Sequence, residues 1–259
     1  MSRDFTAITE TPGTLLSPDQ RTRKAQRYRR AAALAADGHV LEVSCGAGCG
    51  LGYLARHARA VVGLDYTATV LSLARSHYGS RIPLVQGDAQ QLPFPTASFD
   101  LVFCFEAIYY LPDQARFLSE SRRVLTAGGR LLICQSNPDW PDFVPGPLTT
   151  HYPPVPTLTQ AIAEAGFHDI VCHASLPVTR GRRRWASRLR RYALRSGLVE
   201  RLGPLVHLLK AVSYGDLVSL PAELDPGTVA AWTDGATLTP IPADQPDRVH
   251  RVVYAQAHA

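Results

Sequence analysis

The chain has 259 residues, of which 46% are hydrophobic and 19% are charged, and this balance is typical of a globular domain and not of a disordered chain. No stretch reaches the ~18 apolar residues of a membrane span, and the first ten residues hold no apolar signal run, so we expect a cytoplasmic protein. The net charge is +5, with eight arginines between positions 180 and 195. A patch this local suits an acidic ligand or surface and does not by itself indicate nucleic-acid binding.

The five cysteines are odd in number, and most of them fall in predicted strands or in the loop after the first strand. This favours buried, reduced thiols over a disulfide framework. Cys45 and Cys49 have no second cysteine pair or histidine cluster at zinc-site spacing, so we expect no bound metal.

Helix and strand signals alternate from position 18 onward. Ser17 and Pro18 supply an N-cap and a first-turn proline for a helix over 18–36. Short apolar runs then predict strands, with helix-forming segments between them at about 49–57, 67–78 and 113–125; the strands are expected at 39–44, 60–65, 82–87, 100–105 and 129–135. This rhythm indicates a doubly wound, Rossmann-like parallel sheet with a ligand crevice at the carboxyl ends of its strands.

The pattern changes after the run at 129–135. A proline-rich loop leads to a helix at 157–166 and a strand at 169–177, and about 70 residues then precede the last strand-like run at 248–256. We expect this intervening segment to be a helical insert or cap, with a basic helix near 182–196 and an apolar helix from Pro204. The predicted division is an N-terminal helical segment at 1–37, a core at 38–178 and 248–259, and the insert at 179–247.

The strongest motif follows the first strand, where glycines stand at every second position from Gly46 to Gly52. Glycine lets a chain turn sharply and lets a ligand lie against bare backbone. A nicotinamide site would want G-x-G-x-x-G, and this spacing differs from it. Glu42, four positions earlier, would repel a pyrophosphate but would favour a ligand that carries sulfonium and ammonium groups.

Two further carboxylates are predicted at neighbouring strand ends. Asp65 lies 19 residues after Gly46, a distance suited to holding ribose hydroxyls, although it also precedes a helix and could help to cap it. Asp88, in the sequence Gly87-Asp88-Ala89, faces the same crevice and can accept a hydrogen bond from an adenine amine. A buried strand from Ser98 then runs into an aromatic turn.

Taken in order, these motifs resemble the class I S-adenosylmethionine (SAM)-dependent methyltransferases, and in particular the small-molecule group related to the ubiquinone and menaquinone enzymes. The resemblance covers about residues 38–136 and includes Arg123-Val-Leu-x-x-Gly-Gly129. Ser44 and Cys45 depart from the family, which often has aspartate and glycine there. The resemblance implies a seven-stranded, mostly parallel sheet with an antiparallel last strand.

The resemblance also implies SAM as cofactor and S-adenosylhomocysteine as product. Gly46 and Gly48 would border the methionine moiety, with Glu42 beneath the loop, and Asp65 would hold the ribose. Asp88 and Ala89 would hold the adenine, and Phe105 would contribute backbone beside the sulfonium. The full set of expected cofactor-binding residues is Glu42, Gly46, Gly48, Gly50, Asp65, Tyr66, Asp88, Ala89, Phe105 and Glu106.

Methyl transfer from a sulfonium is an in-line displacement, so alignment supplies most of the rate, and a base helps if the acceptor is a hydroxyl. His151, in the proline-rich loop, is the first candidate for that base, although a surface histidine packed on prolines fits it equally well. Tyr109, Tyr110 and Glu106, just after the fourth strand, follow as catalytic candidates, and we expect one of them to shape the cofactor pocket and one to pack. We expect O-methylation of a small organic acceptor, as in biosynthesis of secondary metabolites.

Four arginines of the predicted insert share one helical stripe. A solvated face is the simplest interpretation, and contact with an acidic ligand or with an anionic membrane surface is the sharper one. The four are Arg184, Arg188, Arg191 and Arg195.

Three other functions stay open at this level. The chain could methylate a nucleic acid or a protein, although it shows no appended RNA-binding module and no Asn-Pro-Pro-aromatic motif. It could bind SAM without transferring the methyl group. A nicotinamide oxidoreductase fits less well, because both the glycine spacing and the expected last strand disagree with it.

Overall fold

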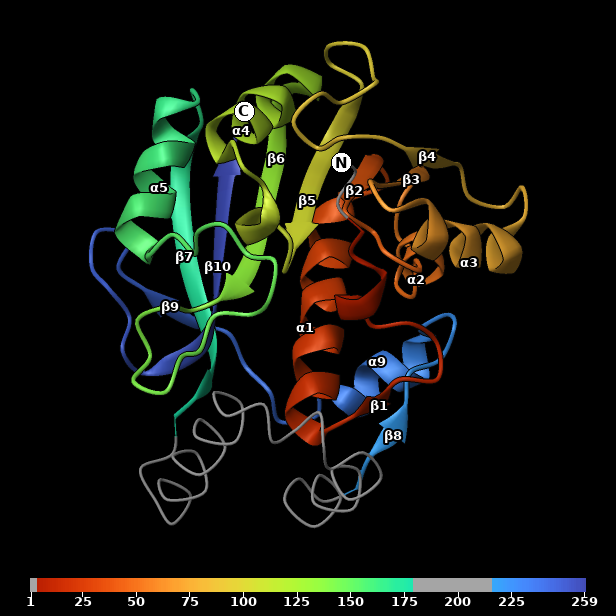
Figure 1. Cartoon of the computed structure of the whole chain (residues 1–259). Helices are drawn as coiled ribbons and strands as arrows, with labels where there is room; N and C mark the ends of the chain where they lie inside the picture. Colours follow the sequence, from red (N-terminus) through yellow and green to blue (C-terminus); the bar gives the residue numbers. More distant parts are fainter. Residues whose placement is uncertain (1–3, 179–215) are drawn as a thin grey trace.

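A computed structural model describes residues 4–178 and 216–259. Its centre is an eight-stranded sheet in the order β4-β3-β2-β5-β6-β10-β7-β9, shown in Figure 1. The strands are β2 (His39–Val43), β3 (Ala60–Asp65), β4 (Leu84–Gln86), β5 (Phe99–Phe105), β6 (Leu125–Ser136), β7 (His168–Pro177), β9 (Thr239–Ile241) and β10 (His250–His258). The first five are parallel, and β10 runs antiparallel to both β6 and β7. The predicted Rossmann-like sheet with an antiparallel last strand is confirmed.

Short β9 pairs antiparallel with β7 and adds an eighth strand to the seven that were expected. A separate two-stranded ribbon joins β1 (Leu15–Leu16) to β8 (Val218–Ser219). The ribbon ties the segment before α1 to the chain that follows residue 216.

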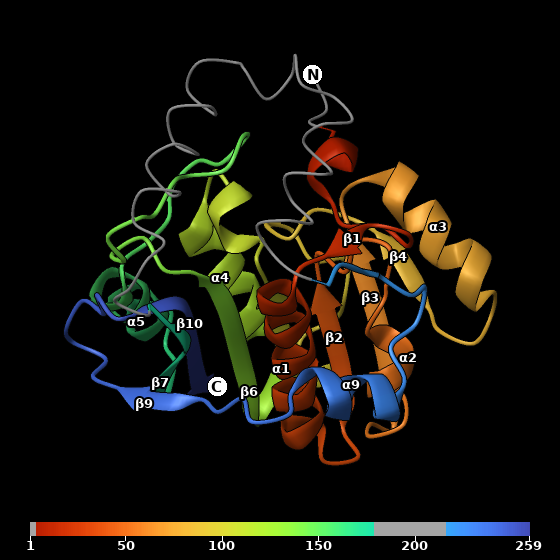
Figure 2. The same ribbon diagram turned by 90° about the horizontal axis from the view of Figure 1, so that it is seen from below.

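Helices cover both faces of the sheet, as Figure 2 shows from below. They are α1 (Pro18–Ala35), α2 (Leu51–Leu54), α3 (Ala68–Tyr78), α4 (Gln114–Val124), α5 (Val155–Glu164) and α9 (Pro226–Trp232), with 3-10 turns η1 (Thr6–Ile8) and η2 (Ile108–Tyr110). α2 is shorter than the helix predicted at 49–57. The others lie within about two residues of the predicted bounds where a prediction was made.

Alternate residues along each strand enter one of two hydrophobic clusters. In β5, Leu101, Phe103 and Phe105 pack in the cluster that includes residues of α1, α2, α3 and α9. Val102 and Cys104 point the other way, into the cluster that includes residues of α4 and α5. Because both faces of the sheet are covered, central strands such as β2 and β5 are mainly apolar, as parallel strands generally are.

α1 begins where the sequence predicts. The Ser17 side chain accepts a hydrogen bond from the Gln20 backbone N–H, and the Gln20 side chain accepts one from the Ser17 N–H. This reciprocal capping box satisfies two of the backbone donors that a helix start leaves free. It fixes the end of α1 that lies nearest the cavity described below.

The 70-residue segment between the last two strands is only partly described. Its arginine stripe (Arg184, Arg188, Arg191, Arg195) and the apolar helix from Pro204 lie outside the described residues. The described remainder holds β8, α9 and β9, and α9 packs against α1. The domain boundaries given above stay a prediction.

The five cysteines are free and buried, as predicted. Within residues 4–178 and 216–259, no helix has both the length and the apolar character needed to cross a membrane. In the same ranges, no group of three or more His, Cys, Asp and Glu side chains could hold a metal ion.

Candidate active site

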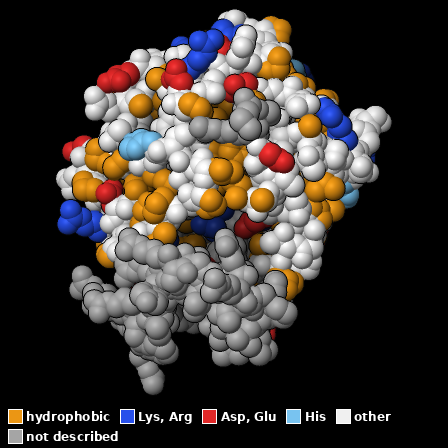
Figure 3. All heavy atoms as spheres, viewed as in Figure 1, with side chains coloured by type: hydrophobic (Ala, Val, Ile, Leu, Met, Phe, Trp, Pro, Cys, Tyr) orange, Lys and Arg blue, Asp and Glu red, His pale blue; other side chains and the backbone are white. Residues whose placement is uncertain are grey.

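One cavity of about 690 Å³ opens at the carboxyl ends of β2, β3, β4 and β5, and residues of α1, β6 and β10 also line it. Figure 3 shows the molecule from the same side as Figure 1. Apolar side chains gather over the middle of this face, next to recessed charged side chains. The cavity lies where a doubly wound sheet is expected to bind its ligand. Two halves can be distinguished by their chemistry.

The glycine-rich loop and two carboxylates form the first half, called here the β2–β4 half. Gly46 and Gly48 have positive φ angles of 56° and 75°, which side chains rarely adopt, so the sequence needs glycine at both positions. The loop turns back on the sheet, and the Gly46 N–H donates to Asp65 Oδ2 at 2.7 Å. The other oxygen of Asp65 accepts from the Thr67 N–H at 2.8 Å.

Asp65 is therefore both a cap-like acceptor and a cavity residue, so its contact with the start of α3 does not exclude a ligand-binding role. Burial raises the pKa of the Asp65 carboxyl, and the backbone hydrogen bonds oppose this rise. Asp88 lines the same half and accepts from the Gln90 N–H at 2.8 Å, with buried Ala89 beside it.

Glu42 lies at the floor of this half and is 2% exposed. The Tyr28 hydroxyl donates to Glu42 Oε1 at 2.8 Å, while Oε2 has no hydrogen-bond partner among the described residues. Burial raises the pKa of Glu42 to about 8, against the lowering effect of Tyr28 and Lys24. A cationic group placed beside Oε2 would satisfy it and stabilise the ionised form.

Aromatic and cationic residues form the second half, called here the β5–β10 half. Tyr109 and Tyr152 stack with ring centroids 4.0 Å apart, and Phe143 meets Tyr152 edge-on at 4.8 Å. The ring centroid of Tyr110 lies 4.7 Å from that of Tyr109. Burial raises the pKa of Tyr109 well above its usual value and that of Tyr110 to about 12, so both phenols are neutral near pH 7.

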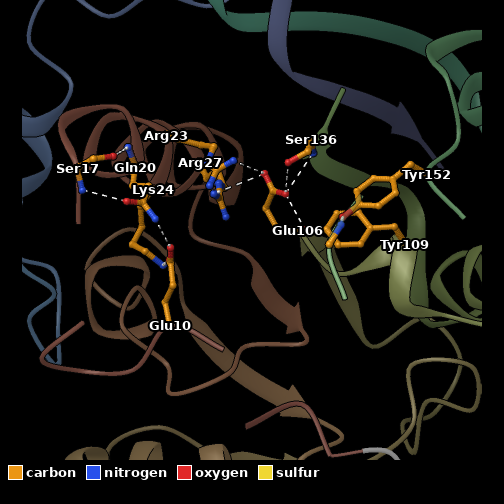
Figure 4. Close-up of polar contacts among 11 residues, drawn as sticks. Glu10, Ser17, Gln20, Arg23, Lys24, Arg27, Glu106, Tyr109, Ser136 and Tyr152 are labelled. Carbon is orange, nitrogen blue, oxygen red and sulfur yellow. Dashed lines mark hydrogen bonds and ion pairs between the residues drawn. The ribbon is translucent and has the colours of Figure 1, made fainter. Parts of the chain in front are cut away.

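Glu106 is central to the second half. Its Oε2 accepts from the Tyr109 hydroxyl at 2.8 Å and from the Ser136 hydroxyl at 2.9 Å, and its Oε1 faces Arg23 and Arg27, each at 3.6 Å (Figure 4). Burial would raise the pKa of Glu106, but the two arginines and the hydrogen bonds hold it below its ordinary value. The carboxylate is therefore ionised at neutral pH.

The structure brings most of the predicted site residues to this one cavity. They are Glu42, Gly46, Gly48, Asp65, Tyr66, Asp88, Ala89, Phe105, Glu106, Tyr109 and Tyr110. Gly50 is absent from the lining: a Cβ there would lie 2.0 Å from the Tyr28 ring, so this glycine admits a buried tyrosine. His151 is exposed and does not line the cavity, so the geometry does not support its expected role as the base.

Several lining residues were missed by the sequence interpretation. Arg23, Lys24 and Arg27 come from α1, Arg251 from β10, and Phe143 from the proline-rich loop. On a helical wheel the α1 residues read as an ordinary solvated face. The α1 residues adjoin Ala25 and Tyr28, which are buried. This burial cannot be read from the sequence without knowing how α1 docks on the sheet.

Comparisons with known proteins agree with this geometry. A family model described as a methyltransferase domain matches residues 41–133. A probable SAM-dependent methyltransferase of Mycobacterium tuberculosis is 38% identical over 149 residues, which cover 55% of this chain and 53% of the relative. A fatty-acid O-methyltransferase of Mycolicibacterium smegmatis is 41% identical over 102 residues, covering 38% of this chain and 37% of that protein. The chain thus spans about half, or less, of the length of these curated relatives.

A solved SAM-dependent methyltransferase from Archaeoglobus fulgidus shares the fold, with a TM-score of 0.59 at 13% identity, over 92% of this chain and 94% of the other. Residues 41–133 of the chain match the methyltransferase-domain family, and the fold is that of solved SAM-dependent methyltransferases. The family segment and the fold therefore agree with the resemblance to class I SAM-dependent methyltransferases that the sequence predicts.

Proposed function

We propose that this chain transfers the methyl group of SAM to an oxygen atom of a small organic acceptor. The cofactor would occupy the β2–β4 half of the cavity and the acceptor the β5–β10 half. The observation that carries the proposal is the meeting, in one cavity, of Gly46, Asp65 and Asp88 from three consecutive strand ends.

The residues of the β2–β4 half fit the cofactor. Asp65 retains lone pairs on both oxygens after accepting two backbone hydrogen bonds, and these can accept from ribose hydroxyls. Glu42 Oε2 is a buried acceptor without a partner among the described residues, as a site for an ammonium or sulfonium group requires. Asp88 and Ala89 would hold the adenine.

Bound SAM would supply an electrophilic methyl group, and the remaining tasks fall to the chain's own residues. Phe105 ends β5 and Glu106 follows it, and Glu106 holds a strained φ of 52° there. Strain in a non-glycine residue is often found at functional sites. The stacked Tyr109 and Tyr152 rings would orient the acceptor and keep water out. Alignment of the acceptor atom with the methyl group would then supply most of the rate.

Transfer to oxygen is supported by the similarity to the fatty-acid O-methyltransferase. Tyr109 and Tyr110, expected earlier as catalytic candidates, would act by shaping the acceptor half, because their raised pKa values make them poor bases near pH 7. The role of His151 as the base remains a prediction, and this geometry does not support it.

Calorimetry with S-adenosylhomocysteine tests the cofactor site. Wild-type protein should bind it, and Asp65→Ala should weaken binding by roughly 10- to 100-fold, since it removes an acceptor of charge-assisted hydrogen bonds. Asp113→Ala is a matched control, because Asp113 caps α4 and does not line the cavity. Equal affinity in wild type and Asp65→Ala would refute the assignment.

Transfer itself is tested by incubating SAM with small acids, phenols and quinones and measuring both released S-adenosylhomocysteine and methylated product. The expected result is stoichiometric formation of the two. Binding of SAM with no released product over the whole panel would favour a non-catalytic use of the cofactor.

A further inference from the structure

Three guanidinium groups line the β5–β10 half and are called here the arginine cluster: Arg23, Arg27 and Arg251. Arg23 and Arg27 are one turn apart on α1, and Arg251 comes from β10. The Nε atom of each is buried and has no hydrogen-bond partner among the described residues. Arg27 as a whole is only 7% exposed.

Glu106, the carboxylate that forms ion pairs with Arg23 and Arg27, does not satisfy their hydrogen-bond donors. Both distances to Glu106 Oε1 are 3.6 Å, which is beyond a hydrogen bond. Figure 4 shows both guanidiniums directed toward Glu106, whose other oxygen is already engaged by Tyr109 and Ser136. Buried donors without acceptors are costly, so this arrangement calls for a further acceptor among the guanidiniums.

The charge balance indicates how much negative charge that acceptor should carry. Arg251 forms an ion pair with Asp19 at 2.6 Å. The single negative charge of Glu106 offsets one of the two positive charges of Arg23 and Arg27. Three cations against two anions leave one positive charge in this set. A monoanion such as a carboxylate matches it better than a phosphate dianion does, and the planar guanidinium fork suits a carboxylate.

The surroundings of the arginine cluster are apolar. Trp140 lies against Arg251, 5.5 Å from the guanidinium carbon to the ring centroid, and the Tyr109, Tyr152 and Phe143 rings continue the wall. Val144, at the mouth, is 46% exposed. An acceptor that reaches the arginines must therefore carry an apolar or aromatic body.

We propose that the arginine cluster binds the carboxylate of the acceptor and that this carboxylate is the group methylated, which makes apolar carboxylic acids the substrate class. The inference rests on the function proposed above. In the transfer, a carboxylate oxygen forms the new O–CH₃ bond, the S–CH₃ bond breaks, and its electron pair stays on sulfur. No proton moves, and the product is a neutral ester that the arginines no longer attract.

The absence of a suitable base in the described part of this half agrees with such an acceptor. Glu106 is held as a weak base by its arginines, the two phenols are neutral, and His151 lies outside the cavity. A carboxylic acid is already ionised at pH 7 and needs no base. The arginine cluster is also next to the end of β5, where the reacting methyl group would lie.

Matched ligands test the inference. We would titrate the full chain, saturated with S-adenosylhomocysteine, with ω-phenylalkanoates of two to eight chain carbons and with the corresponding amides. The acids should bind about 10- to 100-fold more tightly than their amides, because they add charge-assisted hydrogen bonds. Arg23→Gln and Arg251→Gln should each weaken binding of the acid about 10-fold and leave binding of the amide unchanged.

Arg29→Gln is the matched control, since Arg29 lies on α1, is exposed and donates to the Ala236 carbonyl outside this cavity. Thermal melting establishes that each variant is folded; Arg27 is left intact because of its deep burial. Equal affinity for acids and amides over the series, or tighter binding of phenylalkyl phosphates, would overturn the inference.

Separate readouts distinguish the two proposals. If Arg23→Gln weakens S-adenosylhomocysteine and not the acid, the arginine cluster holds the cofactor's own carboxylate and the inference is wrong. If acids bind in an arginine-dependent manner but S-adenosylhomocysteine does not bind, the proposed function fails while the carboxylate site stands. With SAM, mass spectrometry should detect the methyl ester, and methylation at another atom would refute the transfer step.

Discussion

Glu42 shows how a single buried acid can be held ready for a cation. One of its oxygens is bonded by Tyr28, and the other has no partner within the described residues. Without a ligand the ionised form is destabilised by burial, which raises the pKa to about 8. The site therefore holds a proton near neutral pH that a cationic ligand would displace.

The first prediction concerns the pH dependence that follows. A carboxyl with a higher pKa in the folded state than in the unfolded state contributes most to stability below its unfolded pKa of about 4.3. That contribution is lost as the pH rises toward about 8. Urea unfolding of the ligand-free protein between pH 5 and pH 8.5 should show this loss, and Glu42→Gln should flatten the slope.

Glu164→Gln is the control for the first prediction, because Glu164 lies on α5 away from the cavity and bonds only its helix neighbour Gln160 in the described structure. It should leave the pH slope unchanged. An unaltered slope in Glu42→Gln would show that another group dominates, and the account of Glu42 would be wrong.

At the scale of residues, the sequence predicts the β2–β4 half better than the β5–β10 half. Gly46, Asp65 and Asp88 follow strands at fixed spacing, and the geometry of a parallel sheet brings such strand ends together. Arg23 and Arg251 are more than 200 positions apart, and no local pattern connects them. Only the docking of α1 on the sheet reveals the arginine cluster.

At the scale of elements, α1 and α2 meet around one glycine. Tyr28 of α1 packs over Gly50, which precedes α2, and its ring also meets Phe105 of β5 edge-on at 5.6 Å. The same tyrosine bonds Glu42. The position of α1 over the cavity thus depends on the absence of a side chain at position 50.

The second prediction tests that contact. Gly50→Ala would place a Cβ 2.0 Å from the Tyr28 ring, so it should lower the free energy of unfolding by about 1–3 kcal/mol, as overpacking does. Thermal or urea unfolding measures the loss. Gly146→Ala is the control, since a Cβ there meets nothing closer than 3.4 Å.

A double substitution makes the test specific to this pair. Combining Gly50→Ala with Tyr28→Leu should cost less than the sum of the two single changes, because the ring that clashes is gone. Additive costs would show that the alanine acts elsewhere.

The elements also show what sequence patterns can and cannot predict. Apolar runs located β2, β3 and β5 well, because both faces of these strands are buried. β1, β8 and β9 were not predicted: they have two or three residues each, and their pairing partners are distant in sequence. A short strand of that kind is defined by its partner and not by its own residues.

For the whole molecule, the cavity is a junction between the sheet and the segment before α1. Phe5, Thr9 and Glu10 line it beside the glycine loop. Glu10 pairs with the buried Lys24 at 2.7 Å, and although burial would raise the pKa of Glu10, Lys24 and neighbouring arginines lower it to about 2. The Phe5 ring also meets the rings of Tyr66 and Tyr110 across the cavity. A ligand in the β2–β4 half would therefore contact both the segment before α1 and the strand ends of the sheet.

The third prediction follows from that junction and concerns hydrogen exchange. Binding of S-adenosylhomocysteine should slow amide exchange over residues 5–14 by about 10-fold or more, since local opening of this segment would then require loss of ligand contacts. Exchange in α5, which packs on the far face of the sheet, should change little and serves as the internal control. In Asp65→Ala at the same ligand concentration the protection should disappear. Equal protection of residues 5–14 with and without ligand would mean that the segment does not close over the cofactor site, and the division of the cavity into a cofactor half and an acceptor half would have to be redrawn.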